Sequence, residues 1–427
     1  MERNDPRYQA YVEILKEELI PAMGCTEPIA LAYAAAKARE VLGVLPDSVQ
    51  LQVSGSIIKN VKSVIVPNTG HLKGMEAAVA AGIIAGSAEK ELEVISEVSE
   101  EKKSAIRDYL QTVPITIEHT EQGHVFDIVV TERCGQDYAR VRIADYHTNI
   151  CRIEKNGTVL YEVPLLDETV QEDARADRSL LNMQDIWDFA ETADLRDVAD
   201  LLERQIRYNN AIAEEGLLGD YGANIGRVLL TTYGNDVSNR AKAKAAAGSD
   251  ARMNGCELPV IINSGSGNQG ITCSVPLIEY AKELHSGKEK LYRALIISNL
   301  VAIHEKTGIG TLSAYCGAVS AGAGAGAGIV YLCGDGYQAA IHTVVNALAI
   351  VSGIVCDGAK ASCAAKIATS VDAGLLGYHM YRCGNQFYAG DGIVKSGIEH
   401  TIETVGTLAH TGMADTDRQI IRLMMEP

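Results

Sequence analysis

The amino-acid sequence predicts an α+β protein, in which a mostly helical domain carries a smaller, inserted α/β domain. Two observations lead to this expectation. Apolar residues recur at helical spacing almost throughout the chain from Leu181 onward, whereas the segment 46–165 alternates short apolar runs with turn signals, as strands do. We divide the 427 residues into a helical segment that packs with the larger domain (1–45), the small α/β domain (46–165), a charged linker (166–180) and the helical domain (181–427).

The N-terminal segment predicts two helices with a break between them. Apolar residues recur at helical spacing over residues 8–19, and Pro21 ends that helix. The second helix is expected to begin at Thr26, which suits the N-cap. Glu27 then stands in the first turn, where negative charge is favourable, and Pro28 occupies an early helical position.

The small domain is expected to contain a sheet and at least one helix. The turn Pro67-Asn68-Thr69-Gly70 precedes a helix predicted over Lys73–Ala88. Lys155-Asn156-Gly157-Thr158 predicts a hairpin, since Asn-Gly is the strongest short hairpin signal. Strands are expected within the segments 51–53, 57–66, 115–118, 126–131, 139–143, 150–154 and 159–163.

Two runs of the helical domain, Thr307–Gly334 and Gly336–Cys356, are almost free of charge. A membrane-spanning helix needs about 20 strongly apolar residues, and these runs are rich in small or polar ones. We interpret both as buried helices. The alternating Ala-Gly stretch 321–328 would suit a strand by its period, but tight packing between helices favours a helix there.

Charge and cysteine content restrict the partners. The net charge of −17 argues against nucleic acids and anionic membranes as partners. The first residues, MERNDPRYQ, lack the apolar core of a secretory signal, so we expect a cytoplasmic protein whose ten cysteines are free thiols. The apolar, glycine-rich helical core is compatible with a homodimer.

Three cysteines, Cys316, Cys356 and Cys363, bracket a tract in which Asp335 is the only charged residue between Lys306 and Asp357. Thiolates in such surroundings need a positive partner, and an iron–sulfur centre would provide one. Three ligands would leave one iron of a four-iron cluster open to act as a Lewis acid. The alternative is that these residues are small buried hydrophobes, because their spacing matches no zinc site.

A fourth cysteine, Cys25, stands immediately before the predicted second helix. The helix dipole lowers the pKa of a thiol at that position, and a thiolate can serve as a nucleophile or general base. Partial burial would raise that pKa again, so a value near working pH is expected for Cys25. The alternative is a small residue that fits a tight corner between helices.

Two further polar segments are candidates for ligand binding. The loop Asn263–Gly270 follows a predicted strand and precedes an apolar helix, so it can present hydroxyl and N–H groups to an anion, or it is a simple turn. The segment Tyr146–Asn149 either lines a cleft between the domains or ends a strand. The candidate residues in the two segments are Ser264, Ser266, Asn268, Gln269, His147, Thr148 and Asn149.

Several of these motifs together resemble the L-cysteine desulfidase family over essentially the whole chain. The motifs are PAMGCTEPIA, VPNTG, HTNI, NSGSGNQGI, the cysteine set and the tail TVGTLAHTGMADTD. The segment 258–376 also resembles the α-chain of bacterial iron–sulfur L-serine dehydratases. Two features differ from that pattern. The spacing from Cys356 to Cys363 is shorter, and the chain ends in Met424-Met425-Glu426-Pro427 instead of a cysteine that caps the cluster.

The resemblance implies a set of roles. Cys316, Cys356 and Cys363 would hold a [4Fe-4S] cluster that has one iron without a protein ligand. Cys25 would be the base, and Thr26 and Glu27 would lie with the Ser264–Gln269 loop near a small amino-acid substrate. The implied activity is β-elimination of L-cysteine to pyruvate, ammonia and hydrogen sulfide without pyridoxal phosphate. Dehydration of L-serine at the same cluster remains one alternative, and a non-catalytic iron–sulfur or thiol sensor is another.

Overall fold

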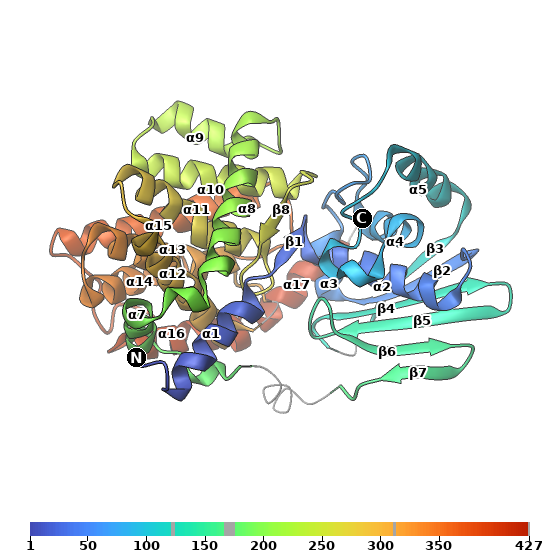
Figure 1. Cartoon of the computed structure of the whole chain (residues 1–427), viewed down its shortest axis with the longest axis horizontal. Helices are drawn as coiled ribbons and strands as arrows, with labels where there is room; N and C mark the ends of the chain where they lie inside the picture. The colour runs from blue at the N-terminus through green and yellow to red at the C-terminus, as the bar shows by residue number, and fades with distance from the viewer. Residues whose placement is uncertain (121–123, 166–175, 311–312, 426–427) are drawn as a thin grey trace.

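The computed structural model describes residues 1–120, 124–165, 176–310 and 313–425. Figure 1 shows a helical domain beside a smaller domain built on one sheet, which confirms the predicted α+β class. Most of the predicted linker, residues 166–175, lies outside the described residues. Of the helices that are described, none is long and apolar enough to cross a membrane.

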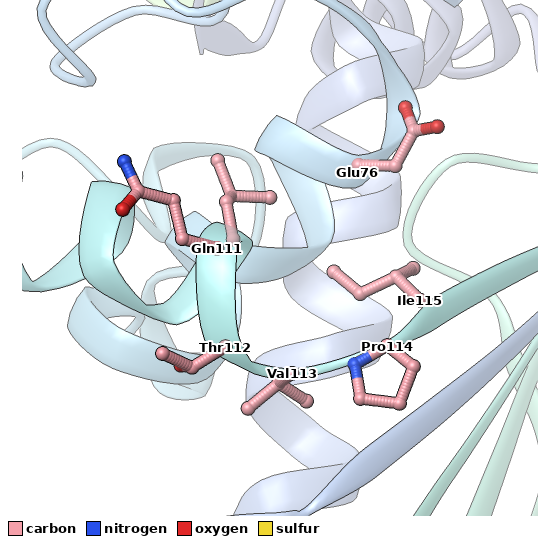
Figure 2. Close-up of a pocket in the computed structure, with 7 residues that line it drawn as sticks. Glu76, Gln111, Thr112, Val113, Pro114 and Ile115 are labelled. Atoms are coloured by element: carbon pink, nitrogen blue, oxygen red, sulfur yellow. The ribbon is translucent and has the colours of Figure 1, made fainter.

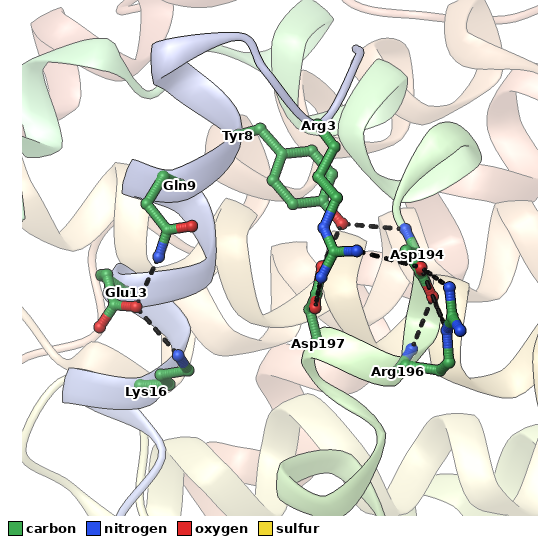
Figure 3. A network of polar contacts seen from close by, with 8 residues as sticks. All are labelled: Arg3, Tyr8, Gln9, Glu13, Lys16, Asp194, Arg196 and Asp197. Carbon is green, nitrogen blue, oxygen red and sulfur yellow. Dashed lines mark hydrogen bonds and ion pairs between the residues drawn. The ribbon is translucent and has the colours of Figure 1, made fainter.

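The first helix packs against the helical domain. Helix α1 (Pro6–Glu18) begins after Asp5, whose side chain accepts a hydrogen bond from the Arg7 N–H. The Tyr8 hydroxyl donates to Asp197 Oδ2 at 2.7 Å and accepts from the Asp194 N–H at 3.0 Å. Figure 3 shows this network between the two segments. The chain therefore starts anchored to the larger domain.

Strand β1 (Pro21–Met23) and helix α2 (Thr26–Leu42) then link the two domains. Strand β1 pairs antiparallel with β8 (Pro259–Ile261) of the helical domain. Helix α2 packs on strands of the small sheet instead. Between them, Gly24 adopts a positive φ of +62°, which an L-residue with a side chain rarely adopts. Cys25 follows at this junction.

The small domain contains a six-stranded sheet in the order β3-β2-β4-β5-β6-β7, in which β2 and β3 run parallel and the other pairs antiparallel. Asn156 and Gly157 both have positive φ, so the predicted hairpin is confirmed. The strands are β2 (Ser48–Ser54), β3 (Ile115–Thr120), β4 (Asp127–Cys134), β5 (Asp137–Ala144), β6 (Ile150–Lys155) and β7 (Thr158–Glu162). The helices are α3 (Gly55–Val61), α4 (Gly74–Ala85), α5 (Glu100–Thr112) and a 3₁₀ turn at Ala88–Glu93.

One predicted strand is wrong, because residues 55–61 form helix α3. All seven residues of α3 are buried. The apolar residues among them therefore reflect burial in the core, which a helix provides as well as a strand does. The C-terminal helix α17 (Ala414–Met425) packs on α3, where the buried Lys59 ammonium pairs with Asp417. The end of the chain therefore docks on the small domain, as Figure 1 also shows.

The helical domain confirms the expectation of helices from Leu181 onward. Helices α12 (Lys288–Ile309) and α13 (Gly317–Cys333) pack directly against each other. The helices are α7 (Met183–Thr192), α8 (Ala199–Leu218), α9 (Ile225–Tyr233), α10 (Val237–Met253), α11 (Gly267–Glu283), α12 (Lys288–Ile309), α13 (Gly317–Cys333), α14 (Tyr337–Val351), α15 (Cys363–Arg382) and α16 (Ile398–Thr407). Shorter 3₁₀ turns cover Arg178–Leu180 and Leu195–Asp197, and a π turn covers Leu408–Gly412.

The alternating Ala-Gly stretch is a helix, as predicted, and lies within α13. A Cβ added at Gly324 would lie 2.4 Å from the Ser298 carbonyl oxygen of α12. A Cβ at Gly322 would lie 2.4 Å from the Ser370 carbonyl oxygen of α15. The glycines therefore allow α13 to approach the backbones of two neighbouring helices.

We expect Gly324→Ala to lower the free energy of unfolding. Alanine improves intrinsic helix propensity by about 1 kcal/mol. The added methyl group collides with backbone that cannot move easily, and overpacking costs about 1–3 kcal/mol. Thermal unfolding measures the balance. Gly353→Ala is the matched control, since that site is exposed with open space around it and should stay near wild type. Equal midpoints for the two variants would contradict the packing argument.

Candidate functional site

One cavity, of about 120 Å³, gathers most of the predicted site residues. Its volume is well below the range of about 300–1,000 Å³ typical of drug-sized ligands, so it suits a small metabolite. It lies where the start of α2, the loop before α11, the end of α12, the start of α13 and the loop before α15 meet. The predicted residues that line it are Cys25, Thr26, Glu27, His147, Ser264, Ser266, Asn268, Gln269, Cys316, Cys356 and Cys363.

The chain brings Cys316 and Cys356 together through a short antiparallel contact. The Cys316 N–H donates to the Ile354 carbonyl at 3.1 Å, and the Cys356 N–H donates to the Ala314 carbonyl at 2.6 Å. Tyr315 and Val355 form the bridge between them. Cys316 also occupies the N-cap position of α13, and such a position favours negative charge.

Cys363 is the first residue of α15 and closes the loop that begins at Cys356. Asp357 forms ion pairs with Lys360 and Lys366, and these hold the loop. Gly358, with φ +91°, packs against α3, because a Cβ there would lie 2.1 Å from the Lys59 carbonyl oxygen. The small domain thus touches the cysteine loop directly.

The three cysteines line one cavity without forming a site for a single metal ion. No group of three His, Cys, Asp or Glu side chains in the described ranges converges closely enough to hold one ion. A four-iron cluster binds each cysteine at a different iron, so its thiolates stand further apart than the ligands of one ion. Cys316, Cys356 and Cys363 line one cavity and interact electrostatically with one another.

The three thiols lie beside a charged side chain in the folded structure, although the sequence around them is almost uncharged. Burial raises the pKa of Cys316 to about 12, and the neighbouring Cys356 adds to this rise. The buried Lys306 ammonium lines the same cavity, and burial lowers its pKa to about 8 while Cys356 and Cys316 oppose that fall. Lys306 therefore places a cation beside thiols that the sequence presents as lying in an uncharged tract.

The corner at Cys25 differs from the expectation in two ways. Cys25, and not Thr26, occupies the N-cap position of α2, and it is buried. Its thiol donates to Glu27 Oε2 at 3.1 Å. Burial raises the pKa of Cys25 well above its usual range, and the Glu27 carboxylate raises it further, so the expected value near working pH is wrong. The effect of the helix N-terminus is smaller than these two.

Thr26 connects this corner to the glycine-rich loop. Its hydroxyl lies 3.0 Å from the Gly265 carbonyl oxygen and 3.1 Å from Glu27 Oε2. The loop is a tight turn, in which Asn263 and Ser266 exchange backbone hydrogen bonds and Ser264 adopts a φ of +48°. Helix α11 begins immediately afterwards, so the start of that helix lies in the cavity wall.

Several buried polar atoms at the cavity have no partner within the described part of the chain. They are Nε2 of His147, Oδ1 of Asn268, Oε1 of Gln269 and Nε of Arg252. Gln269 lies against Gly317, where an added Cβ would be 2.6 Å from its Cδ, and it is thus next to Cys316. Unpartnered buried polar atoms are unfavourable unless a ligand or water completes them.

The segment Tyr146–Asn149 contributes only His147 to the cavity. The His147 ring packs edge-on against Phe126 with centroids 4.7 Å apart, and burial lowers its pKa. Thr148 and Asn149 do not line the cavity. Asn149 instead donates to the Ala144 carbonyl at 2.9 Å, because its side chain closes the turn after β5. The geometry therefore gives no support for the predicted roles of Thr148 and Asn149.

Sequence reasoning missed several residues of the cavity wall, among them Arg252, Lys306 and Asn60. Arg252 follows an alanine-rich stretch with other charges and stands in no motif, so nothing in the sequence distinguishes it. Lys306 is visible only as the last charge before an apolar tract. Asn60 belongs to the segment that we predicted to be a strand.

A larger, open pocket of about 400 Å³ lies in the small domain and contains none of the predicted site residues. Figure 2 shows it between the end of α5, the start of β3 and Glu76. Glu76 is its only charged side chain, and the rest of the lining comes from residues 110–115. This pocket offers no convergent chemistry, so the cysteine cavity remains the candidate site.

Comparisons with known proteins place the chain among relatives that match it over its whole length. The sequence model of a family described as Serine dehydratase alpha chain matches residues 89–422. A UPF0597 protein of Desulfitobacterium hafniense is 60% identical over 425 residues, which cover 100% of this chain and 98% of that protein. A UPF0597 protein of Lachnoclostridium phytofermentans is 53% identical over 418 residues, covering 98% and 100%, respectively.

Proposed function

This chain belongs to the serine dehydratase alpha-chain family, and from that membership we propose that it is a carbon–sulfur lyase that acts on L-cysteine. The overall reaction consumes L-cysteine and water and yields pyruvate, ammonia and hydrogen sulfide. It proceeds by β-elimination without pyridoxal phosphate. The observation that carries this proposal is the single cavity that Cys25, the polar loop Ser264–Gln269 and the three further cysteines share.

Three cysteines that line one small cavity suit an iron–sulfur lyase. Cys316, Cys356 and Cys363 would hold a [4Fe-4S] cluster in which one iron has no protein ligand. When bound, such a cluster supplies a soft Lewis acid that stabilises a departing sulfide. The Ser264–Gln269 loop and the start of α11 then lie close enough to orient a substrate beside it.

Cys25 is the proposed base that removes the α-proton. Its thiol donates a hydrogen bond to Glu27 Oε2 at 3.1 Å. In its deprotonated form, the Cys25 sulfur is a thiolate and can accept the α-proton of the substrate. The elimination product, aminoacrylate, tautomerises and hydrolyses to pyruvate and ammonia. Arg252 favours the thiolate, because its positive charge opposes the rise in the pKa of Cys25.

L-Serine is the second candidate substrate, because the matching family is described as Serine dehydratase alpha chain. The reaction would be the same, with hydroxide as the leaving group. We favour L-cysteine because a soft metal centre binds sulfur better than oxygen.

Full-length protein reconstituted with iron and sulfide under anaerobic conditions should release sulfide, ammonia and pyruvate from L-cysteine in equal amounts. The kcat/KM for L-cysteine should exceed that for L-serine. A higher kcat/KM for L-serine would reassign the protein as a serine dehydratase. No turnover of either substrate by protein with an intact cluster would favour a non-catalytic sensor.

A further inference from the structure

The guanidinium of Arg252 is buried and has no anionic partner in the structure. Only 2% of the residue is exposed. Within the described ranges Arg252 forms no ion pair or hydrogen bond, and its Nε is both buried and unpartnered. A buried charge without a partner destabilises a protein. Such an unpaired charge is tolerated where a bound ligand supplies the missing partner.

The fold holds this guanidinium in one place at the cavity wall. Arg252 lies in the last turn of α10. Its side chain rests on Gly267, where an added Cβ would lie 2.3 Å from Nε and 2.7 Å from Cζ. Gly267 is the first residue of α11, and the start of a helix also favours an anion. Two positive features therefore meet at this part of the wall.

Glu27, the acidic residue of the cavity lining, makes its hydrogen bonds to other groups. Glu27 accepts hydrogen bonds from the Cys25 thiol and the Thr26 hydroxyl, both at 3.1 Å. Within the described ranges, no hydrogen bond or ion pair joins Glu27 to Arg252. On the same wall, Asn268 Oδ1 and Gln269 Oε1 are acceptors without donors. This part of the wall thus offers a guanidinium and two free acceptor oxygens, which are the complement of an α-carboxylate and an α-ammonium group.

We propose that Arg252 binds the α-carboxylate of an L-α-amino acid, and that the side-chain oxygens of Asn268 and Gln269 accept hydrogen bonds from its α-ammonium group. This inference deepens the proposed function and rests on it for the identity of the substrate class. The planar guanidinium can bind a carboxylate through two parallel hydrogen bonds. Because Gln269 lies next to Cys316, the amino acid would project its β-substituent toward the three cysteines.

Binding of L-alanine tests this inference, because L-alanine has no leaving group and cannot be turned over. The full-length protein, kept anaerobic, is titrated calorimetrically with L-alanine, with propionate, which lacks the ammonium group, and with ethylamine, which lacks the carboxylate. We expect L-alanine to bind the wild type more tightly than either fragment. Arg252→Met should weaken L-alanine binding at least tenfold and leave ethylamine binding unchanged. Arg252→Lys keeps the positive charge but loses the two parallel hydrogen bonds of a guanidinium. Its affinity for L-alanine should lie between those of the wild type and Arg252→Met.

Arg240→Met is the matched control, because Arg240 lies on the same helix but pairs with Glu283 at the surface. It should bind L-alanine like the wild type. Without ligand, Arg252→Met should unfold at a midpoint no lower than the wild type, since it removes an unpaired buried charge. Equal L-alanine affinity in the wild type and Arg252→Met, or no binding by the wild type, would overturn the inference. So would a lowered midpoint, which would assign Arg252 a structural role. These results stand whether or not L-cysteine or L-serine is turned over.

Discussion

Replacing Cys25 with serine is expected to reduce β-elimination by about 10²–10⁴-fold, the contribution typical of a positioned general base. A serine hydroxyl at this position would keep the hydrogen bond to Glu27 but would be a far poorer base. The iron and sulfide content should not change, because Cys25 is not among the proposed ligands. Cys383→Ser is the matched control, since Cys383 is exposed and does not line the cavity. Its turnover should equal that of the wild type.

The pH dependence of kcat/KM identifies the base independently. The base acts in its deprotonated form, and burial with Glu27 raises the pKa of Cys25, so the rate should increase with pH through neutrality and beyond. Glu27→Gln removes one cause of the raised pKa, so the rise should move to lower pH. Burial lowers the pKa of His147, so a histidine base would give a profile that is already flat above about pH 6.5. A flat profile together with near-normal turnover by Cys25→Ser would transfer the role to His147.

Replacing Cys316 with alanine is expected to abolish cluster binding and, with it, all turnover. With three protein ligands, the loss of one leaves a cluster held at only two corners. Cys356→Ala and Cys363→Ala should behave alike. The measurement is the iron and sulfide content of anaerobically reconstituted protein, about four of each per chain in the wild type, together with the visible absorption spectrum.

Cys134→Ala provides the control for cluster loss. Cys134 ends strand β4 of the small domain and does not line the cavity, so this variant should keep its iron. Thermal unfolding of both variants separates a lost cluster from a lost fold. A Cys316→Ala variant that retained a full complement of iron would contradict the proposed ligand set, and equal iron loss in Cys134→Ala would point to a general effect of cysteine removal.

The sequence by itself was sufficient for the elements that local patterns determine. The Asn156-Gly157 hairpin and most of the strands appear as expected, because turn chemistry and apolar alternation act over a few residues. The alternating Ala-Gly stretch was correctly interpreted as a helix. The candidate cysteines and the Ser264–Gln269 loop were identified as motifs, and the structure brings them to one cavity, although their roles remain predictions.

Tertiary structure alone decided the features that depend on neighbours distant in sequence. Residues 55–61 form α3 because the sheet and α17 bury them on all sides, and burial overrides their strand preference. The pKa of Cys25 rises because burial and Glu27 outweigh the helix N-terminus, and no local pattern reports burial. Arg252 shows no motif, yet the fold places its unpaired guanidinium in the cavity wall. The electrostatic interactions of a buried group depend on its distances to other charges in the folded structure. The order of residues along the chain does not give those distances.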